Sequence, residues 1–143
     1  YVIGNEEIMK QMEKFALFTA MYSSSIVQYA IANKKDKMEY FIDNARQIMS
    51  ERMQLVYDGL NEIKGLSCKK SEGGLYIWLR CKELEEDDKK FADRLLYNAK
   101  VATVPGSCFG ESGKGYLRVS LGAEKEKIIE AIKRIKDEIE NGD

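Results

Sequence analysis

The fold is decided by residues 65–80, which read GLSCKKSEGGLYIWLR. Within this stretch the spacing of apolar residues changes from about 3.6, typical of a helix, to 2, typical of a strand. Residues 66–70 and 75–80 are therefore predicted to form the two strands of a hairpin, joined by a turn at residues 71–74. Alternation along the second strand gives it one apolar face, made of Leu75, Ile77 and Leu79. The opposite face carries Tyr76, Trp78 and Arg80.

Upstream of this stretch, residues 36–65 are predicted to form one long amphipathic helix. Asp36 and Glu39 have the spacing of a capping box at its start, and Gly65 is placed to end it. Its apolar residues recur in steps of three and four, at Met38, Phe41, Ile42, Ala45, Ile48, Met49, Met53, Val56, Leu60 and Ile63. Further upstream we expect the tail of a strand at residues 1–4, a helix capped by Asn5, and a short apolar helix after the serines at 23–25.

Downstream of the hairpin, helices and strands alternate. A helix is predicted to start within residues 85–90, a short strand at 101–104, and a longer strand at 116–121 after a glycine-rich loop. A final helix packs through Ile128, Ile129, Ile132, Ile135 and Ile139. The predicted fold class is therefore α+β, a small three- to four-stranded sheet covered by helices, with a long N-terminal helix.

Composition excludes several classes of function. The chain has 143 residues, 44% of them hydrophobic, and a formal net charge of −1, which fits one globular domain and offers no cationic excess for nucleic acid or a membrane surface. It contains no histidine, which excludes histidine-based triads and zinc sites. Its apolar stretches are too short to span a membrane. Cys68, Cys81 and Cys108 are scattered and odd in number, so we expect a reducing, cytoplasmic location without a thiolate metal site.

The glycine-rich loop at residues 106–115, GSCFGESGKG, invites comparison with a phosphate-binding P-loop. That template requires glycine where Cys108 stands and a hydroxyl where Gly115 stands. A P-loop also opens a helix, whereas this loop leads into a predicted strand. The loop is therefore interpreted as a turn between strands.

Arg118 is the candidate binding residue. Alternation places it on the polar face of the strand at 116–121, between Tyr116 and Ser120. A guanidinium held on a rigid strand can bind a carboxylate through two parallel hydrogen bonds. Periodicity alone favours the alternative, a solvated arginine or a surface ion pair.

The order of three motifs resembles the C-terminal part of the class I/II aminotransferases, the pyridoxal-phosphate enzymes of the aspartate aminotransferase fold. These motifs are GGLYIWL at 73–79, VATVPGSCFG at 101–110 and GYLRVS at 115–120. The resemblance covers essentially the whole chain, and it implies the small domain of the fold type I architecture. Residues 1–143 are then expected to be a C-terminal fragment, with 1–35 as linker or edge of a missing large domain and 36–143 as the compact α+β core.

The resemblance also implies a function. Arg118 matches the family's arginine that binds the α-carboxylate of the amino acid or 2-oxo acid substrate. By the resemblance, the Schiff-base lysine lies upstream of Tyr1. Lysines of this chain such as Lys34, Lys35, Lys89 and Lys90 lie in polar runs, which do not provide the desolvated pocket that such a lysine needs. We therefore expect no catalytic, cofactor-binding or metal-binding residue in this chain. The full-length parent is expected to be a homodimer that binds pyridoxal 5'-phosphate mainly through its large domain, and the fragment alone is expected to be inactive.

Other functions remain open at this stage. A pyridoxal-phosphate-dependent lyase or synthase of the same fold, or a non-catalytic aminotransferase-like regulatory domain, would share this architecture. A non-enzymatic interaction module is the more distant alternative. The sequence leaves the substrate's side chain open, because most residues that select it are expected in the missing domain.

Overall fold

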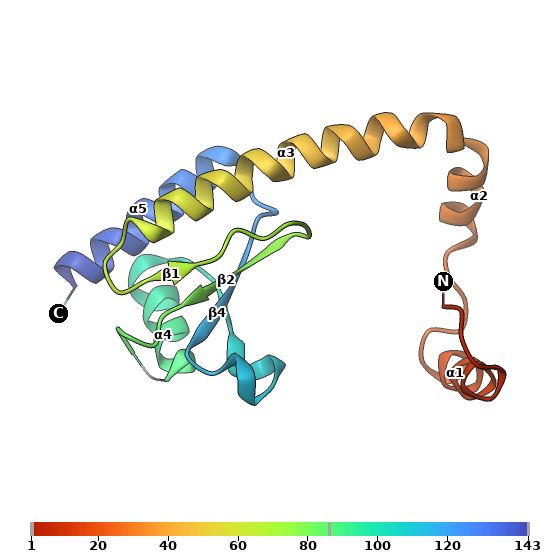
Figure 1. The fold of residues 1–143 in the computed structure, drawn as a ribbon, viewed down its shortest axis with the longest axis horizontal. Helices are drawn as coiled ribbons and strands as arrows, with labels where there is room; N and C mark the ends of the chain where they lie inside the picture. Colours follow the sequence, from red (N-terminus) through yellow and green to blue (C-terminus); the bar gives the residue numbers. More distant parts are fainter. Residues whose placement is uncertain (1, 86, 143) are drawn as a thin grey trace. The chain divides into compact units, whose positions relative to one another are not determined.

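The structure is a computed structural model that describes residues 2–85 and 87–142, without the side chain of Asp36. Its helices are α1 (Glu6–Thr19), α2 (Ser25–Asn33), α3 (Lys35–Asn61), α4 (Asp88–Arg94) and α5 (Lys125–Asn141). Its strands are β1 (Ser67–Cys68), β2 (Tyr76–Arg80), β3 (Val104–Pro105) and β4 (Tyr116–Ser120). The chain divides into two compact units, Tyr1–Asn44 and Ala45–Asp143, and α3 runs from the first into the second (Figure 1).

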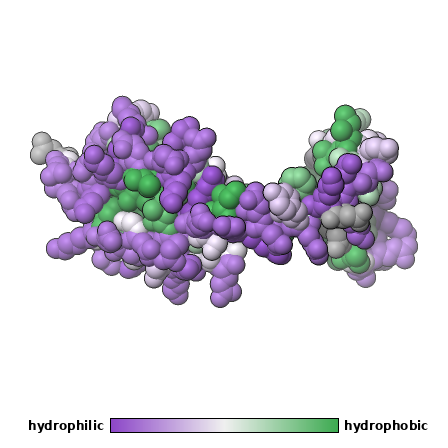
Figure 2. Space-filling model, turned by 90° about the horizontal axis from the view of Figure 1, so that it is seen from above, coloured by the Kyte–Doolittle hydropathy of each residue, from purple (hydrophilic) through white to green (hydrophobic). Residues whose placement is uncertain are grey.

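The first unit contains α1, α2 and the start of α3. As predicted, Asn5 caps α1, because its Oδ1 accepts a hydrogen bond of 2.9 Å from the N–H of Glu7. The predicted helix after the serines is α2. Residues 2–4 belong to no strand, and Tyr1 lies outside the described residues, as does the Asp36 side chain of the predicted capping box. Neither α1 nor α2 buries a side chain, and hydrophobic residues of this unit are visible on the surface in Figure 2, at the right of the view.

The second unit is built on a four-stranded antiparallel sheet with strand order β1-β2-β4-β3. The predicted hairpin is confirmed, because β1 and β2 pair antiparallel, although β1 is only two residues long. The strand predicted at residues 101–104 is shorter than expected and lies at Val104–Pro105. The reason is local, since the N–H of Val101 closes the preceding helix by donating to the carbonyl of Leu95 at 3.0 Å.

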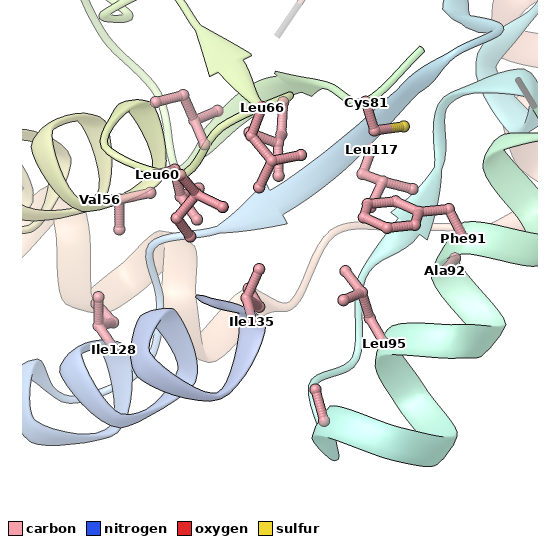
Figure 3. Packing of buried hydrophobic residues seen from close by; sticks show 14 of the residues in the cluster. Val56, Leu60, Leu66, Cys81, Phe91, Ala92, Leu95, Leu117, Ile128 and Ile135 are labelled. Atoms are coloured by element: carbon pink, nitrogen blue, oxygen red, sulfur yellow. The ribbon is translucent and has the colours of Figure 1, made fainter. Parts of the chain in front are cut away.

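One face of the sheet forms the core. Ile77, Leu79 and Leu117 are at most 1% exposed and belong to one buried cluster with residues of α3, α4, α5 and the π-helical turn Leu95–Ala99 that extends α4. Figure 3 shows part of this cluster, with Leu117 of the sheet beside Phe91 of α4. The helical residues of this core are Met53, Val56, Leu60, Phe91, Ala92, Leu95, Ala99, Ile128 and Ile135. The α+β class and the helical cover predicted from the sequence are confirmed. In the last helix the prediction fails at Ile129, which is 49% exposed.

The long helix α3 ends earlier than the sequence predicts, at Asn61 and not at Gly65. Its last residue turns its side chain to the sheet. Asn61 Oδ1 accepts a 2.9 Å hydrogen bond from the N–H of Cys68, and its Nδ2 donates to the carbonyl of Tyr57 at 2.8 Å. A side chain that bonds to a strand thus ends the helix before the glycine is reached.

Candidate functional site

Arg118 lies at the centre of β4, flanked by strands on both sides. In the register of the sheet it stands opposite Trp78 of β2 and opposite Val104 of β3. The predicted alternation is confirmed, because Leu117 and Leu121 are fully buried in the core while Arg118 stays half-buried. Arg118 therefore projects from the face of the sheet opposite the core.

That opposite face is aromatic and open. Tyr76, Trp78 and Phe109 are 44%, 42% and 50% exposed, so within the described part of the chain no layer of helices covers them. An antiparallel sheet of this kind keeps one face in the core and leaves the other for solvent or a partner.

Two aromatic rings contact the guanidinium of Arg118. Its Cζ lies 4.2 Å from the centroid of the Tyr76 ring and 4.7 Å from that of the Phe109 ring. Among residues 2–85 and 87–142, Arg118 makes no hydrogen bond or ion pair. Of the two alternatives that periodicity favoured, the surface ion pair is thus absent from this region, and the solvated arginine remains open. The N–H donors of Arg118, which lie in the guanidinium plane, have no partner within this described part of the chain.

Phe109 reaches Arg118 from the glycine-rich loop. The loop folds as two 3₁₀ turns, Gly106–Phe109 and Glu111–Gly113, and leads into β4 as predicted, which is not the context of a P-loop. Between the turns Gly110 has φ 118° and ψ 174°, a conformation essentially restricted to glycine. Trp78 packs edge-on against Phe109, with ring centroids 5.5 Å apart.

A buried carboxylate ties this loop to α4. Asp88 is 4% exposed, and its Oδ2 accepts a 2.8 Å hydrogen bond from the N–H of Ser107. Burial raises the pKa of Asp88, but hydrogen bonds from the Ser107 backbone and other loop groups outweigh burial and leave the pKa below its usual value. Asp88 is therefore ionised near neutral pH and holds the start of the loop.

Cys81 is a buried thiol beside the same carboxylate. Burial, followed by the negative charge of Asp88, raises its pKa to about 11. Its Sγ lies 3.4 Å from the carbonyl of Gly115, to which it donates. A buried thiol that stays neutral is not a nucleophile. Cys81 therefore has a packing role beside the loop.

A groove of about 790 Å³ adjoins the aromatic face. Its aromatic walls are Tyr76, Trp78, Phe109 and Tyr116, and its cations are Lys69, Lys70 and Arg80. Arg80 is already paired with Glu83 at 2.8 Å, and Lys70 donates to the side-chain oxygen of Gln54.

The lysines and the possible metal ligands of the described residues are distributed as follows. Every lysine is exposed, so none has the desolvated environment that lowers a lysine pKa for Schiff-base chemistry. Within residues 2–85 and 87–142, no three Cys, Asp or Glu side chains gather as a metal site. Among those residues there is also no helix both long and apolar enough to cross a membrane.

Sequence reasoning singled out Arg118 but missed its two aromatic contacts. Tyr76 could have been found from the sheet, because it lies two residues from Trp78, the residue opposite Arg118, and such diagonal neighbours are within reach of long side chains. Phe109 carries no comparable signal, because its position depends on the path of the loop.

Comparison with known protein families gives one extensive match. The family model described as aminotransferase class I and II matches residues 1–135. The aspartate aminotransferase of Pyrococcus abyssi is 35% identical over 137 residues, which cover 94% of this chain and 35% of that protein. The aromatic-amino-acid aminotransferase 2 of Thermococcus litoralis is 32% identical over 137 residues, again 94% of this chain and 35% of that protein.

Solved structures agree with the sequence comparison. The crystal structure of an aromatic aminotransferase from Pyrococcus horikoshii matches with a TM-score of 0.81 at 35% identity, over 93% of this chain and 36% of that one. The chain thus spans about a third of the length of the relatives it matches.

Proposed function

The chain belongs to the aminotransferase class I and II family, and from this premise we propose that it is the C-terminal small domain of a pyridoxal-phosphate-dependent enzyme. That enzyme transfers an amino group between an amino acid and a 2-oxo acid. Residues 1–35 form the linker and the edge of the large domain, and residues 36–143 form the small domain's core. α3 begins at Lys35, next to this boundary, whereas the compact second unit of the structure begins at Ala45, within the same helix.

Within this enzyme, Arg118 binds the α-carboxylate of the substrate. The observation that carries this role is a half-buried guanidinium on the open face of the sheet, with two rings against it and no hydrogen bond or ion pair among the described residues. The central strand fixes the backbone of Arg118, and the fork of its guanidinium matches a planar carboxylate. Because every amino acid and 2-oxo acid carries the same carboxylate, one arginine orients both substrates.

The cofactor is held mainly by the rest of the enzyme, of which this chain spans about a third. When bound, pyridoxal phosphate serves as an electron sink for the amino acid. The chain on its own is therefore inactive. The enzyme acts as a homodimer in the cytoplasm, a location that suits three cysteines found free among the described residues.

Replacement of Arg118 in the full-length enzyme tests the carboxylate role. Arg118→Ala removes the charge-assisted hydrogen bonds and leaves a carboxylate unpaired in the site, a loss of about 2–5 kcal/mol. At about 1.4 kcal/mol per decade, kcat/KM falls by about 1.5 to 3.5 orders of magnitude, equally for the amino acid and the 2-oxo acid. Steady-state kinetics with both substrates measures the loss.

Two further variants sharpen this test. Arg118→Lys recovers part of the activity, because an ammonium keeps the charge without the fork. Arg134→Ala is the matched control, because Arg134 is an exposed arginine of α5 paired with Glu130, and it leaves kcat/KM unchanged. If Arg118→Ala lowers kcat/KM by less than about threefold, Arg118 is only a surface residue of the strand.

A further inference from the structure

Tyr76 and Phe109 form what we call the aromatic seat of Arg118. The two residues come from different parts of the chain, β2 and the glycine-rich loop, and both rings lie within 5 Å of the Arg118 Cζ. Cation–π contacts of this kind attract a guanidinium to the ring without using its N–H donors.

The seat contributes little to the core of this unit. Tyr76 is 44% exposed and Phe109 50% exposed, and neither belongs to the buried cluster. Single exposed hydrophobic residues are normal on a protein surface, but neighbouring aromatic residues that are exposed together, such as Tyr76, Trp78 and Phe109, mark a site for a ligand or partner. Packing inside the described residues therefore does not explain why two rings stand beside the arginine.

Phe109 is also held in place by contacts other than that with Arg118. Trp78 meets its ring edge-on, and the loop that carries it is anchored at the N–H of Ser107 by the buried carboxylate of Asp88. The close backbone contact of Gly106 with Gly113 fixes the same loop. Phe109 thus presents its ring from a fixed loop, as Tyr76 does from a strand.

We propose that Tyr76 and Phe109 are positioning residues, which act on the substrate through Arg118. The seat holds the guanidinium in one orientation before the carboxylate arrives, so that binding loses less side-chain entropy. This inference rests on the carboxylate role proposed for Arg118. Immobilising one flexible side chain costs about 0.5–1.5 kcal/mol, which corresponds to about a two- to tenfold change in affinity.

The experiment uses the full-length enzyme and propionate, a carboxylate that lacks both the amino and the oxo group and therefore cannot react. Its inhibition constant, measured in competition with the amino acid, reports the binding of the carboxylate group alone. Tyr76→Leu and Phe109→Leu remove one ring each at similar size, whereas Tyr76→Phe and Phe109→Tyr keep the ring. Tyr97→Leu, at a 68% exposed tyrosine outside the seat, is the control.

Each leucine variant is expected to raise the propionate inhibition constant about two- to tenfold. The KM values of the amino acid and the 2-oxo acid rise by the same factor, with kcat changed less. The ring-keeping variants and Tyr97→Leu stay within about twofold of the unchanged enzyme. In an Arg118→Ala background, Tyr76→Leu has no further effect, because the ring acts only through the guanidinium.

The outcomes separate this inference from the function on which it rests. If Arg118→Ala weakens propionate but the leucine variants do not, the seat is wrong and the carboxylate role stands. An equal loss from Tyr76→Leu with and without Arg118 also overturns the seat, because the ring would then act independently. If Arg118→Ala leaves propionate binding unchanged, the carboxylate role itself fails.

A second measurement needs no variant and so does not depend on folding. In the NMR spectrum of the 143-residue chain, the side-chain Nε–Hε group of Arg118 should show a heteronuclear NOE close to that of the sheet backbone. Arg94, whose Nε donates to the carboxylate of Glu138 at 2.8 Å, provides the reference for an arginine held in one orientation. An Arg118 side chain much more mobile than that of Arg94 would overturn the proposal.

Discussion

Two glycines bring the backbone of the loop against itself beside Arg118. A Cβ placed on Gly106 would overlap the carbonyl oxygen of Gly113, and a Cβ on Gly113 would overlap the carbonyl oxygen of Gly106. The obstacle is backbone on both sides, which cannot rotate away as a side chain can. The contact therefore restricts both positions to glycine.

Gly106→Ala is predicted to destabilise the domain by at least about 2–3 kcal/mol, because the loop must open to admit the methyl group. Gly73→Ala is the matched control, since a Cβ there meets no atom within 4 Å, and it should change stability by less than about 0.5 kcal/mol. Urea denaturation measures both values. Equal stability of the two variants would contradict the close contact.

Asp88 is the buried charge of the described core, and it stabilises the same loop. Its pKa is lower in the folded state than in the unfolded chain. The ionised carboxylate therefore stabilises the fold above the unfolded pKa of about 3.9, and this stabilisation is lost as the pH falls towards the lowered folded value.

Asp88→Asn is predicted to cost about 1.5–3 kcal/mol at pH 7, the usual contribution of a hydrogen bond to a charged group. The difference from the unchanged chain should shrink below about pH 4, where Asp88 of the unfolded chain becomes protonated. Thermal unfolding followed between pH 3 and pH 7 tests both statements. Asp93→Asn, at an exposed aspartate of the same helix, is the control and should show neither effect.

At the scale of elements, α3 has two different halves. Towards its C-terminus, Met53, Val56 and Leu60 are buried in the core cluster, in which Figure 3 labels Val56 and Leu60. Towards its N-terminus, Phe41 and Ile42 are 58% and 39% exposed, although they continue the same apolar spacing. The same spacing of apolar residues thus lies in the core in one half of the helix and on an uncovered surface in the other.

This asymmetry predicts different costs for similar substitutions along one helix. Leu60→Ala removes a 1% exposed side chain and should cost about 2–5 kcal/mol, as is usual for large-to-small changes in a core. Ile42→Ala should cost less than about 1 kcal/mol in this chain. Chemical denaturation of both variants provides the comparison. Equal costs would mean that the first half of α3 is also packed.

At the scale of the whole molecule, the first unit exposes many apolar side chains. Phe15 and Phe18 of α1 are 72% and 87% exposed, and Ile26 of α2 is 82% exposed. A few such residues are normal on a protein surface, but a concentration of them marks a site of contact with other protein. This accords with the proposed role of residues 1–35 at the edge of a larger domain.

The isolated chain is therefore predicted to bind a hydrophobic dye and to self-associate weakly. Replacing both Phe15 and Phe18 by serine should lower dye fluorescence and association without lowering the stability of the second unit. Leu96→Ser, at an exposed apolar residue of the second unit, should change either value little. A chain that is monomeric and silent to dye at high concentration would contradict the prediction.

The sequence by itself determined the elements and the faces of the strands. The change of period after Gly65 predicted the hairpin, and alternation placed Leu117 in the core and Arg118 on the other face. These predictions succeed because the direction of a side chain follows from the local repeat of the backbone. The resemblance to the family came from the order of the motifs, because the spacing of apolar residues carries no information about family.

Only the tertiary structure decided where elements end and which side chains meet. α3 ends at Asn61 because this residue bonds to Cys68 on another element. Phe109 reaches Arg118 because the contact of Gly106 with Gly113 and the carboxylate of Asp88 set the path of the loop. Such contacts join residues that are distant in sequence. No local repeat encodes them, because they depend on how the whole chain packs.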